Sequence, residues 1–228
     1  RLAEPQASHW FGTDNFGRDI FSRIMEGTQT SFLIGFASVA IGLAFGLLIG
    51  AAAGYWGGWA DEALMRVMDA KLAFPGILLA IMLVSVFGPG LVNTIVALGV
   101  MSIPAFARIA RSGFIQYKEF AFVKAAAARG AGPMRQIVRH ILPNVASPLI
   151  VACSLRFSGS ILAEAGLSYL GLGVQPPDPS WGRMLSEAQP FIVNAPWYVF
   201  ITGAVITTMV LGFNLLGDGF RDVSDNRR

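Results

Sequence analysis

The sequence predicts an all-α membrane protein, and three observations support this fold class. Hydrophobic residues make up 54% of the 228 residues and charged residues only 14%, well below the ~25% of an ordinary soluble domain. Three long stretches carry no charged side chain: residues 27–60, 72–107 and 188–217. The 26 glycines also suit membrane helices, because small residues let neighbouring backbones approach closely.

Five membrane helices follow from these stretches. A helix needs about 20 apolar residues to cross a bilayer, so the first and last uncharged stretches hold one helix each. The middle stretch holds two, separated by a tight turn at Gly88-Pro89-Gly90. Another helix follows the basic segment in the middle of the chain and is interrupted by Arg156. The predicted spans are residues 30–54, 69–87, 91–113, 144–165 and 193–217.

Positive charge orients these spans, because cytoplasmic loops are rich in Lys and Arg. Segment 108–140 carries seven basic residues against the single acid Glu119 and is predicted to be cytoplasmic. Alternation then places residues 1–26 and the loop 166–192 outside, and the loop 55–68 and the tail 218–228 in the cytoplasm. An external N-terminal segment without a visible secretion signal is unusual. We therefore expect a further membrane helix upstream of Arg1.

A glycine repeat marks one face of the first span. Gly42, Gly46, Gly50 and Gly54 recur every four residues and form a flat stripe suited to close helix contact. The stripe predicts either packing inside this subunit or contact with another subunit, and the spacing alone does not separate the two.

The basic cytoplasmic segment is predicted to be structured. Residues 119–129 are rich in Ala, the best helix former; Gly130 and Gly132 then break the helix, and Pro133 opens a second one at its first turn. This second helix, residues 134–141, is predicted to stop at Leu142-Pro143. We expect a compact helical knob, within a coupling segment at residues 114–142, that fills a socket on a partner.

This segment resembles the cytoplasmic motif of ATP-binding-cassette (ABC) importer permeases, which has the form E-A-A-x3-G-x9-I-x-L-P. The chain has Lys124-Ala125-Ala126, Gly130, and His140 with Leu142-Pro143 at matching spacing. Lys124 and His140 depart from the usual Glu and Ile. The ending R-H-I-L-P-N at residues 139–144 is similar to the version found in peptide permeases. Lys124 reverses a charge and removes any salt bridge that the usual Glu makes.

Two further stretches resemble the dipeptide, oligopeptide and nickel branch of this family. Residues 12–19 read G-T-D-N-F-G-R-D, similar to the signature that precedes the second helix of these permeases. Residues 167–177, L-S-Y-L-G-L-G-V-Q-P-P, with P-S-W-G at 179–182, resemble the outer loop of the C-type subunit. The resemblance extends from Phe11 to Gly219.

The resemblance implies a fold and a set of partners. It implies a type I importer permease of six helices, here a single transmembrane permease domain over residues 1–228 with five visible helices. Its partners would be a second homologous permease in a heterodimer, two cytoplasmic ATPase subunits, an external substrate-binding protein and the lipid bilayer, without nucleic acid. The ATPase contact would fall on Glu119, Lys124, Ala125, Ala126, Arg129, Gly130, Ala131 and Gly132.

The implied function is uptake of di- or oligopeptides across the bacterial inner membrane. Nickel complexes, glutathione or another small solute are the alternatives within the same architecture. ATP and Mg would bind the ATPase subunits, because none of the three lysines of this chain lies in a G-K-[ST] phosphate-binding loop. We therefore expect no cofactor on this chain and no enzymatic activity.

Arg156 and Glu164 are the candidate residues of the translocation path. Arg156 lies 13 residues beyond Pro143, about 20 Å along a helix and thus near mid-membrane. A charge there is costly unless it faces a partner or an aqueous cavity. It either lines the path, where it would attract a peptide carboxylate, or pairs with a neighbouring helix or the second permease. Glu164, two turns further along, is expected to have a structural or gating role.

The remaining polar and aromatic candidates are predicted to be structural. His9 and His140 are isolated, which is typical of surface residues rather than metal ligands, and Cys153 suits helix packing. The tryptophans fall near span ends, as interfacial anchors do: Trp10, Trp56, Trp59, Trp181 and Trp197.

Two other classes of function are disfavoured. A stand-alone secondary transporter is expected to have an inverted repeat and broken helices that coordinate ions, and neither is evident. An intramembrane enzyme needs a nucleophile with a base, or a metal cluster, at membrane depth. The predicted spans contain no His, and beyond Asp69 at the first position of span 69–87 their only acid is Glu164, so no catalytic residue and no metal site is predicted.

Overall fold

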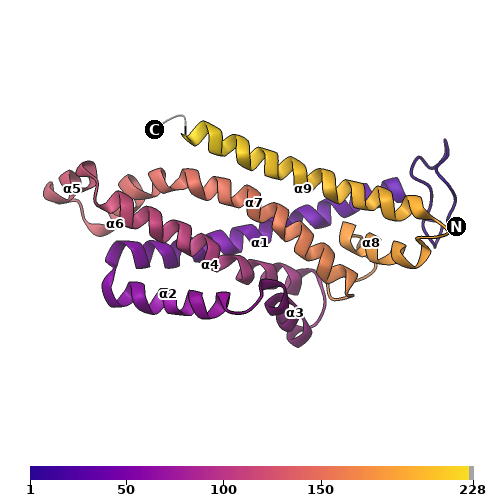
Figure 1. Ribbon diagram of the computed structural model, residues 1–228, viewed down its shortest axis with the longest axis horizontal. Helices are drawn as coiled ribbons and strands as arrows, with labels where there is room; N and C mark the ends of the chain where they lie inside the picture. The colour runs from indigo at the N-terminus through magenta and orange to yellow at the C-terminus, as the bar shows by residue number, and fades with distance from the viewer. Residues whose placement is uncertain (226–228) are drawn as a thin grey trace.

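The computed structural model describes residues 1–225, and the side chains of residues 223–225 lie outside that description. Over this range the regular structure is helical, which confirms the all-α fold class. Most helices run along the long axis of an elongated bundle (Figure 1). In chain order they are α1 (Ile20–Trp56), α2 (Gly58–Leu72), α3 (Gly76–Phe87), α4 (Leu91–Lys118), α5 (Ala121–Ala128), α6 (Pro133–Arg135), the π-helix η1 (Gln136–Ile141), α7 (Leu142–Tyr169), α8 (Trp181–Ala188), the 3₁₀ helix η2 (Gln189–Phe191) and α9 (Pro196–Asp225).

Four continuous helical segments within the described residues are long and apolar enough to cross a membrane. They are Ile20–Trp56, Leu91–Lys118, Pro133–Tyr169 and Pro196–Asp222. The predicted span 69–87 is wrong as a single helix, because α2 and α3 are bent by 84° at the break between them. Pro75 explains the break: it lacks a backbone N–H and disfavours helical geometry at the residue before it. The bent pair brings the number of candidate spans to five.

The predicted cytoplasmic loop 55–68 is largely helical, since α2 fills most of it. Gly57, with φ +66°, makes the sharp turn between α1 and α2, a conformation that a residue without Cβ adopts at little cost. Two ion pairs then tie α2 to α4. Arg111 donates to Asp61 at 2.5 and 2.7 Å, and Arg108 donates to Asp69 at 2.6 Å. Asp61 of the predicted loop and Asp69 at the start of the predicted span thus attach α2 to the bundle.

Several helices extend beyond their predicted ends. α1 begins at Ile20 rather than at residue 30, because the Asp19 side chain caps it by accepting from the amide of Ser22. α4 runs on to Lys118 and α9 to Asp225, so the start of the predicted tail is helical. Arg227 and Arg228 of that tail lie outside the described residues. The second cytoplasmic helix does not stop at Pro143, because the π-helical turn before it leads directly into α7.

The glycine stripe packs inside this subunit, on α4. A Cβ added at Gly46 would lie 2.5 Å from Cβ of Phe106, and one at Gly54 would lie 2.7 Å from the carbonyl oxygen of Arg111. At Gly50 the added atom would collide with the carbonyl oxygen of Ala107. The open alternative from the sequence is therefore decided in favour of an internal contact. Along this stripe the backbones of α1 and α4 are in close contact.

Aromatic side chains fill the space between α1, α7 and α9. Phe157 of α7 lies against Phe36 of α1, with ring centroids 4.5 Å apart, and against Phe213 of α9 at 4.0 Å. Trp181 joins this core with only 1% of its surface exposed, so its predicted role as an interfacial anchor is wrong. Its indole N–H donates to the carbonyl oxygen of Ile24 at 3.3 Å.

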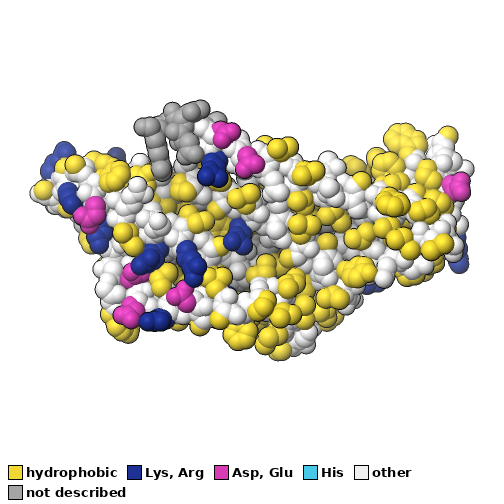
Figure 2. Space-filling model, in the orientation of Figure 1, with side chains coloured by type: hydrophobic (Ala, Val, Ile, Leu, Met, Phe, Trp, Pro, Cys, Tyr) yellow, Lys and Arg dark blue, Asp and Glu magenta, His cyan; other side chains and the backbone are white. Residues whose placement is uncertain are grey.

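The two ends of the bundle differ in composition. α5 and α6 lie at one end, and the N-terminal segment and α8 lie at the other (Figure 1). On the face shown in Figure 2, most charged side chains lie over α2, α5 and the end of α9, and the remaining surface is a mixture of hydrophobic and uncharged groups, with a few charges at the end bearing the N-terminal segment. In the predicted orientation, the end bearing α5 is cytoplasmic.

Candidate functional site

The coupling segment forms the predicted helix, turn and second helix. α5 covers residues 121–128 of the predicted helix 119–129. The turn follows at Gly130, whose φ of +83° lies in the left-handed region that favours glycine. Pro133 then occupies the first turn of α6, where its missing N–H costs nothing. The order of structure along this segment is therefore the one that its Gly and Pro residues predicted.

α5 is seated on the bundle by one side and free on the other. Val123 is 2% exposed and belongs to a hydrophobic cluster with Phe114, Ile137 and Ile141. Lys124, Ala125 and the two alanines that follow Ala126 are exposed. A short helix held by an apolar contact and presenting a small-residue face can enter a groove of another protein without rearrangement.

All eight predicted coupling residues lie together on this projecting segment. Ala126, Arg129 and Ala131 line a shallow cavity of about 350 Å³, together with Phe122, Arg135 and His140. The Nζ atom of Lys124 lies 2.8 Å from Oε2 of Glu119, and both side chains are exposed. This hydrogen bond lowers the pKa of Glu119 below its ordinary value. The reversed charge at Lys124 is thus matched inside the segment itself.

Arg156 lies on an open surface between α4 and α7. Its exposed side chain lines a cavity of about 250 Å³ with Met101, Ser102, Ile109, Ala152, Leu155, Gly159 and Ser160. Among the described residues it has neither an ion pair nor a hydrogen-bond partner. The cavity offers one cation and two hydroxyl groups in apolar surroundings, and its lining contains no carboxylate. Such a lining can accept an anion.

Glu164 does not line that cavity. It is 1% exposed, and its Oε1 atom accepts hydrogen bonds from Ser168 at 2.6 Å and Ser180 at 2.7 Å. These contacts fasten the start of α8 to α7, and Gly182 completes the junction because an added Cβ would lie 2.5 Å from Cα of Ala165. The two candidate path residues are therefore in different environments, one open and one enclosed.

A buried charge cluster at the opposite end of the bundle was not predicted from the sequence. Arg23 is 7% exposed, and its Nη1 donates to Asp14 at 3.0 Å, Glu187 at 2.7 Å and Tyr198 at 3.1 Å. Arg18 donates from Nε to Asp14 at 2.6 Å. The motif at residues 12–19 thus joins the N-terminal segment to α1, α8 and α9. The signal was present in that motif, but nothing near it in sequence identified Glu187 or Tyr198 as partners.

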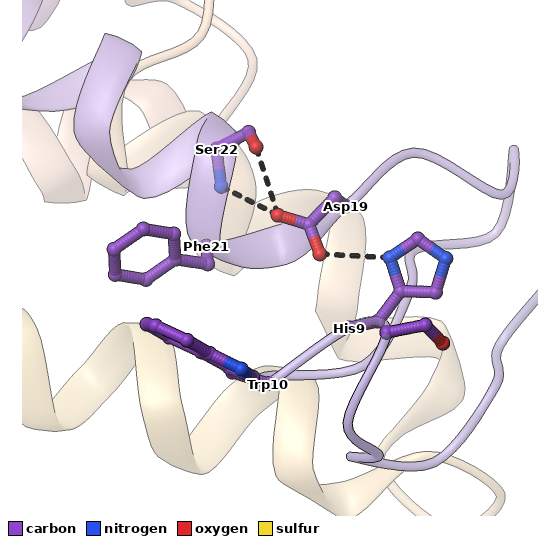
Figure 3. A pocket seen from close by; sticks show the side chains of 6 residues that line it. His9, Trp10, Asp19, Phe21 and Ser22 are labelled. Carbon is purple, nitrogen blue, oxygen red and sulfur yellow. Dashed lines mark hydrogen bonds and ion pairs between the residues drawn. The ribbon is translucent and has the colours of Figure 1, made fainter.

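A shallow cavity of about 410 Å³ lies on the outer side of the same motif, with His9, Trp10, Asp19 and Phe21 in its lining. Figure 3 shows His9 and Ser22 directed at the Asp19 carboxylate, with Trp10 beside Phe21. Nδ1 of His9 is 3.0 Å from Oδ1 of Asp19. His9 thus forms part of the cap of α1. His140 is half-buried beside the turn of the coupling segment.

The sequence and the fold are similar to those of known transport proteins. Residues 46–228 match the family model described as the binding-protein-dependent transport system inner membrane component. A dipeptide transport system permease protein of Alkalihalophilus pseudofirmus is 48% identical over 225 residues, which cover 99% of this chain and 74% of that protein. A glutathione transport system permease protein of Pectobacterium atrosepticum is 47% identical over 226 residues, covering 99% and 75%.

Solved structures share the fold at lower identity. The MetNI methionine ABC transporter in an inward-facing conformation superposes with a TM-score of 0.71 at 18% identity, covering 90% of this chain and 97% of that chain. An amino acid ABC transporter solved with histidines gives a TM-score of 0.66 at 19% identity, covering 88% and 92%. At these identities the likeness concerns the fold.

Proposed function

This chain belongs to the family of binding-protein-dependent transport system inner membrane components, and from that premise we propose that it forms half of the transmembrane pathway of an ATP-driven importer for di- or oligopeptides. Membership makes it a multi-pass permease of the bacterial inner membrane. The substrate, the energy source and the identity of the partner subunits belong to the proposal.

The coupling segment is the observation that carries the proposal. α5 lies at the end of the bundle (Figure 1), with its apolar side seated by Val123 and its alanine face free. In the proposed complex this helix occupies a cleft of one ATPase subunit. Closure of the two ATPases on ATP moves the segment as a rigid body and switches the pathway between inward- and outward-facing states.

The proposed complex contains this chain, a second homologous permease, two ATPases and an external binding protein. ATP and Mg bind the ATPases, where the phosphate-binding loops would be. Many large hydrophobic side chains of this chain are exposed, such as Leu48, Val86 and Leu215. This exposure supports a surface that faces lipid. Specificity is divided between the binding protein and the pathway.

Arg156 is the proposed contact for the substrate inside the pathway. A peptide carries a C-terminal carboxylate, and the cavity at Arg156 combines a guanidinium with two hydroxyl groups. A guanidinium binds a carboxylate by charge-assisted hydrogen bonds. Glu164 supports the path indirectly, by holding α8 on the end of α7.

Glutathione is the second candidate substrate. The glutathione permease of Pectobacterium atrosepticum is 47% identical to this chain and the dipeptide permease is 48% identical, so the relatives do not separate the two. Glutathione is itself a small peptide with free carboxylates, and the Arg156 guanidinium would bind a carboxylate of either ligand by the same chemistry.

Reconstitution of the complete complex in proteoliposomes tests the proposal. With the binding protein outside and ATP inside, labelled dipeptide should accumulate only when all subunits are present, and unlabelled glutathione competes if it shares the pathway. Uptake by this chain without the ATPases, or no uptake of either ligand by the complete complex, would contradict the proposal.

A Gly130→Val variant tests the coupling segment in the same vesicles. The left-handed backbone at Gly130 disfavours a β-branched residue by about 1–2 kcal/mol, so α5 should lose its orientation and ATP hydrolysis should no longer drive uptake. Gly88→Val is the matched control, because Gly88 has φ +93° in the open turn between α3 and α4. It should keep the ratio of uptake to hydrolysis. Normal transport by Gly130→Val would remove the segment from the mechanism.

A further inference from the structure

A chain of two side-chain hydrogen bonds joins the end of α1 to the turn of the coupling segment. The hydroxyl group of Tyr55 donates to Oε1 of Gln136 at 3.0 Å. Nε2 of Gln136 donates to the carbonyl oxygen of Ala131 at 2.7 Å. Gln136 thus uses both ends of its amide, one toward α1 and one toward the turn that orients α5.

A third hydrogen bond fixes the backbone of Tyr55 itself. Nζ of Lys118, the last residue of α4, donates to the carbonyl oxygen of Tyr55 at 3.0 Å. The Tyr55 ring is half-buried and packs against the same hydrophobic cluster that contains Val123. Tyr55 is therefore held by α4 through its backbone and by this hydrophobic cluster through its ring.

The part of α1 that precedes Tyr55 is packed closely against α4. Gly54, the residue before it, already contacts α4 so closely that an added Cβ would lie 2.7 Å from the Arg111 carbonyl oxygen. The same close contact continues up α1 at Gly50, Gly46 and Gly42. A movement imposed on Tyr55 must therefore move α1 and α4 together, because close-packed interfaces shift as units rather than deform.

We propose that Tyr55 and Gln136 are positioning residues that transmit the movement of the coupling segment to the α1–α4 pair. The inference rests on the proposed function, since it assumes that partner ATPases move the segment. The apolar seat at Val123 attaches α5 to the bundle, and the link through Gln136 fixes the direction in which the turn pushes. Neither side chain touches substrate or nucleotide.

Two nearly isosteric variants cut the link at different points. Tyr55→Phe removes only the hydroxyl that reaches Gln136. Gln136→Glu keeps an oxygen for Tyr55 and loses the donor to Ala131. In the complete reconstituted complex, each should lower peptide uptake per ATP hydrolysed by about three- to tenfold, the equivalent of one net hydrogen bond. Subunit assembly, melting temperature and the rate of ATP hydrolysis should change little.

A double-mutant cycle separates transmission from two unrelated defects. Because both side chains act in one link, Tyr55→Phe combined with Gln136→Glu should be no worse than the more severe single variant. Tyr169→Phe makes the same chemical change at an exposed position at the other end of α7, and it should leave the uptake-to-hydrolysis ratio at the wild-type value.

Three results would overturn the link: an unchanged ratio in both single variants, multiplied losses in the double variant, or losses that only follow reduced assembly. Failure of the proposed function is distinguishable from these. In that case the wild-type complex itself shows no ATP-driven uptake of dipeptide or glutathione. A working wild type with unaffected variants rejects the link alone.

Discussion

At the scale of single residues, Asp14 is a fully buried carboxylate held by several hydrogen bonds. Its side chain has no exposed surface, yet it accepts hydrogen bonds from the amides of Phe16 and Arg18 and from the guanidinium groups of Arg18 and Arg23. Burial alone would raise the pKa of Asp14, but these bonds hold the pKa below its ordinary value. The carboxylate is therefore a source of stability only while it is ionised.

The sign of the pH effect follows from this lowered pKa. The contribution of Asp14 is fully present above the pKa of the unfolded chain and is lost as the pH falls through the folded pKa, below about 4. Asp14→Asn should cost about 2 kcal/mol at pH 7 and should flatten the loss of stability on acidification. Melting of the purified protein in detergent between pH 7 and pH 3 measures both effects.

Asp178→Asn provides the control for this variant. Asp178 is an exposed acid of the loop 166–192, so its replacement should change neither the melting temperature at pH 7 nor the decrease in melting temperature at low pH. If Asp14→Asn behaves like Asp178→Asn, the cluster around Arg23 does not stabilise the N-terminal segment.

Arg156 gives the second prediction at this scale. Arg156→Gln keeps a polar side chain but removes the charge, so the maximal rate of dipeptide uptake should fall about tenfold through loss of a charge-assisted bond. A dipeptide amide, which lacks the carboxylate, should be transported equally by both proteins. Arg66→Gln on the exposed face of α2 is the matched control. Unchanged uptake with intact assembly would exclude the path role, and loss of assembly would instead indicate pairing with the second permease.

At the scale of elements, the contact between α1 and α4 depends on the absence of side chains. Gly50→Ala adds one methyl group, which would collide with the Ala107 carbonyl oxygen and lie 2.7 Å from Cβ of Ala110. Overpacking of this kind costs about 1–3 kcal/mol, because backbone atoms cannot rotate away. The variant should melt at lower temperature in detergent, and the loss should be larger with Gly50→Val.

Gly212→Ala on α9 is the comparison for the glycine stripe. Gly212 is exposed, and an added Cβ would meet nothing within 4 Å, so Ala should be neutral or slightly stabilising through its better helix propensity. Equal melting temperatures for the Gly50 and Gly212 variants would show that the helices can separate to accept the methyl group.

The same scale shows what the sequence could predict and what it could not. Gly130 and Pro133 act locally, so the turn and the start of α6 followed from residue type. α2 was missed because its attachment comes from another helix: Asp61 was assigned to a loop and Asp69 to the start of a span, and the pairing of these acids with Arg111 and Arg108 appears only in the structure. Trp181 was misplaced for a related reason. Its burial depends on Ser31 and Ile24 of α1, about 150 residues away.

The residues of the candidate site also differ in how far the sequence could identify them. The coupling residues are contiguous, so the sequence could group them before the structure placed them on one segment. Tyr55 and Gln136 are 81 residues apart, and no local pattern distinguishes this pair from other Tyr and Gln residues. Partners across helices require the register that the glycine stripe sets, and that register is a property of packing.

At the scale of the whole molecule, the orientation in the membrane is the property that all other assignments depend on. The charge-rich end with α5 is predicted to be cytoplasmic and the end with the N-terminal segment external.

Cys153 is the only cysteine, so a Cys153→Ser background supports single-cysteine labelling. Ser8→Cys and Ala128→Cys place an exposed thiol at opposite ends. A membrane-impermeant maleimide should label the first in intact spheroplasts and the second only after permeabilisation. The reverse pattern would put α5 outside, away from any cytoplasmic ATPase. If the bent α2–α3 pair crosses the bilayer, three crossings separate Ser8 from Ala128 and the two thiols lie on opposite sides. Labelling of both thiols from one side would mean that only α1 and α4 cross between them and that the bent pair is not a span.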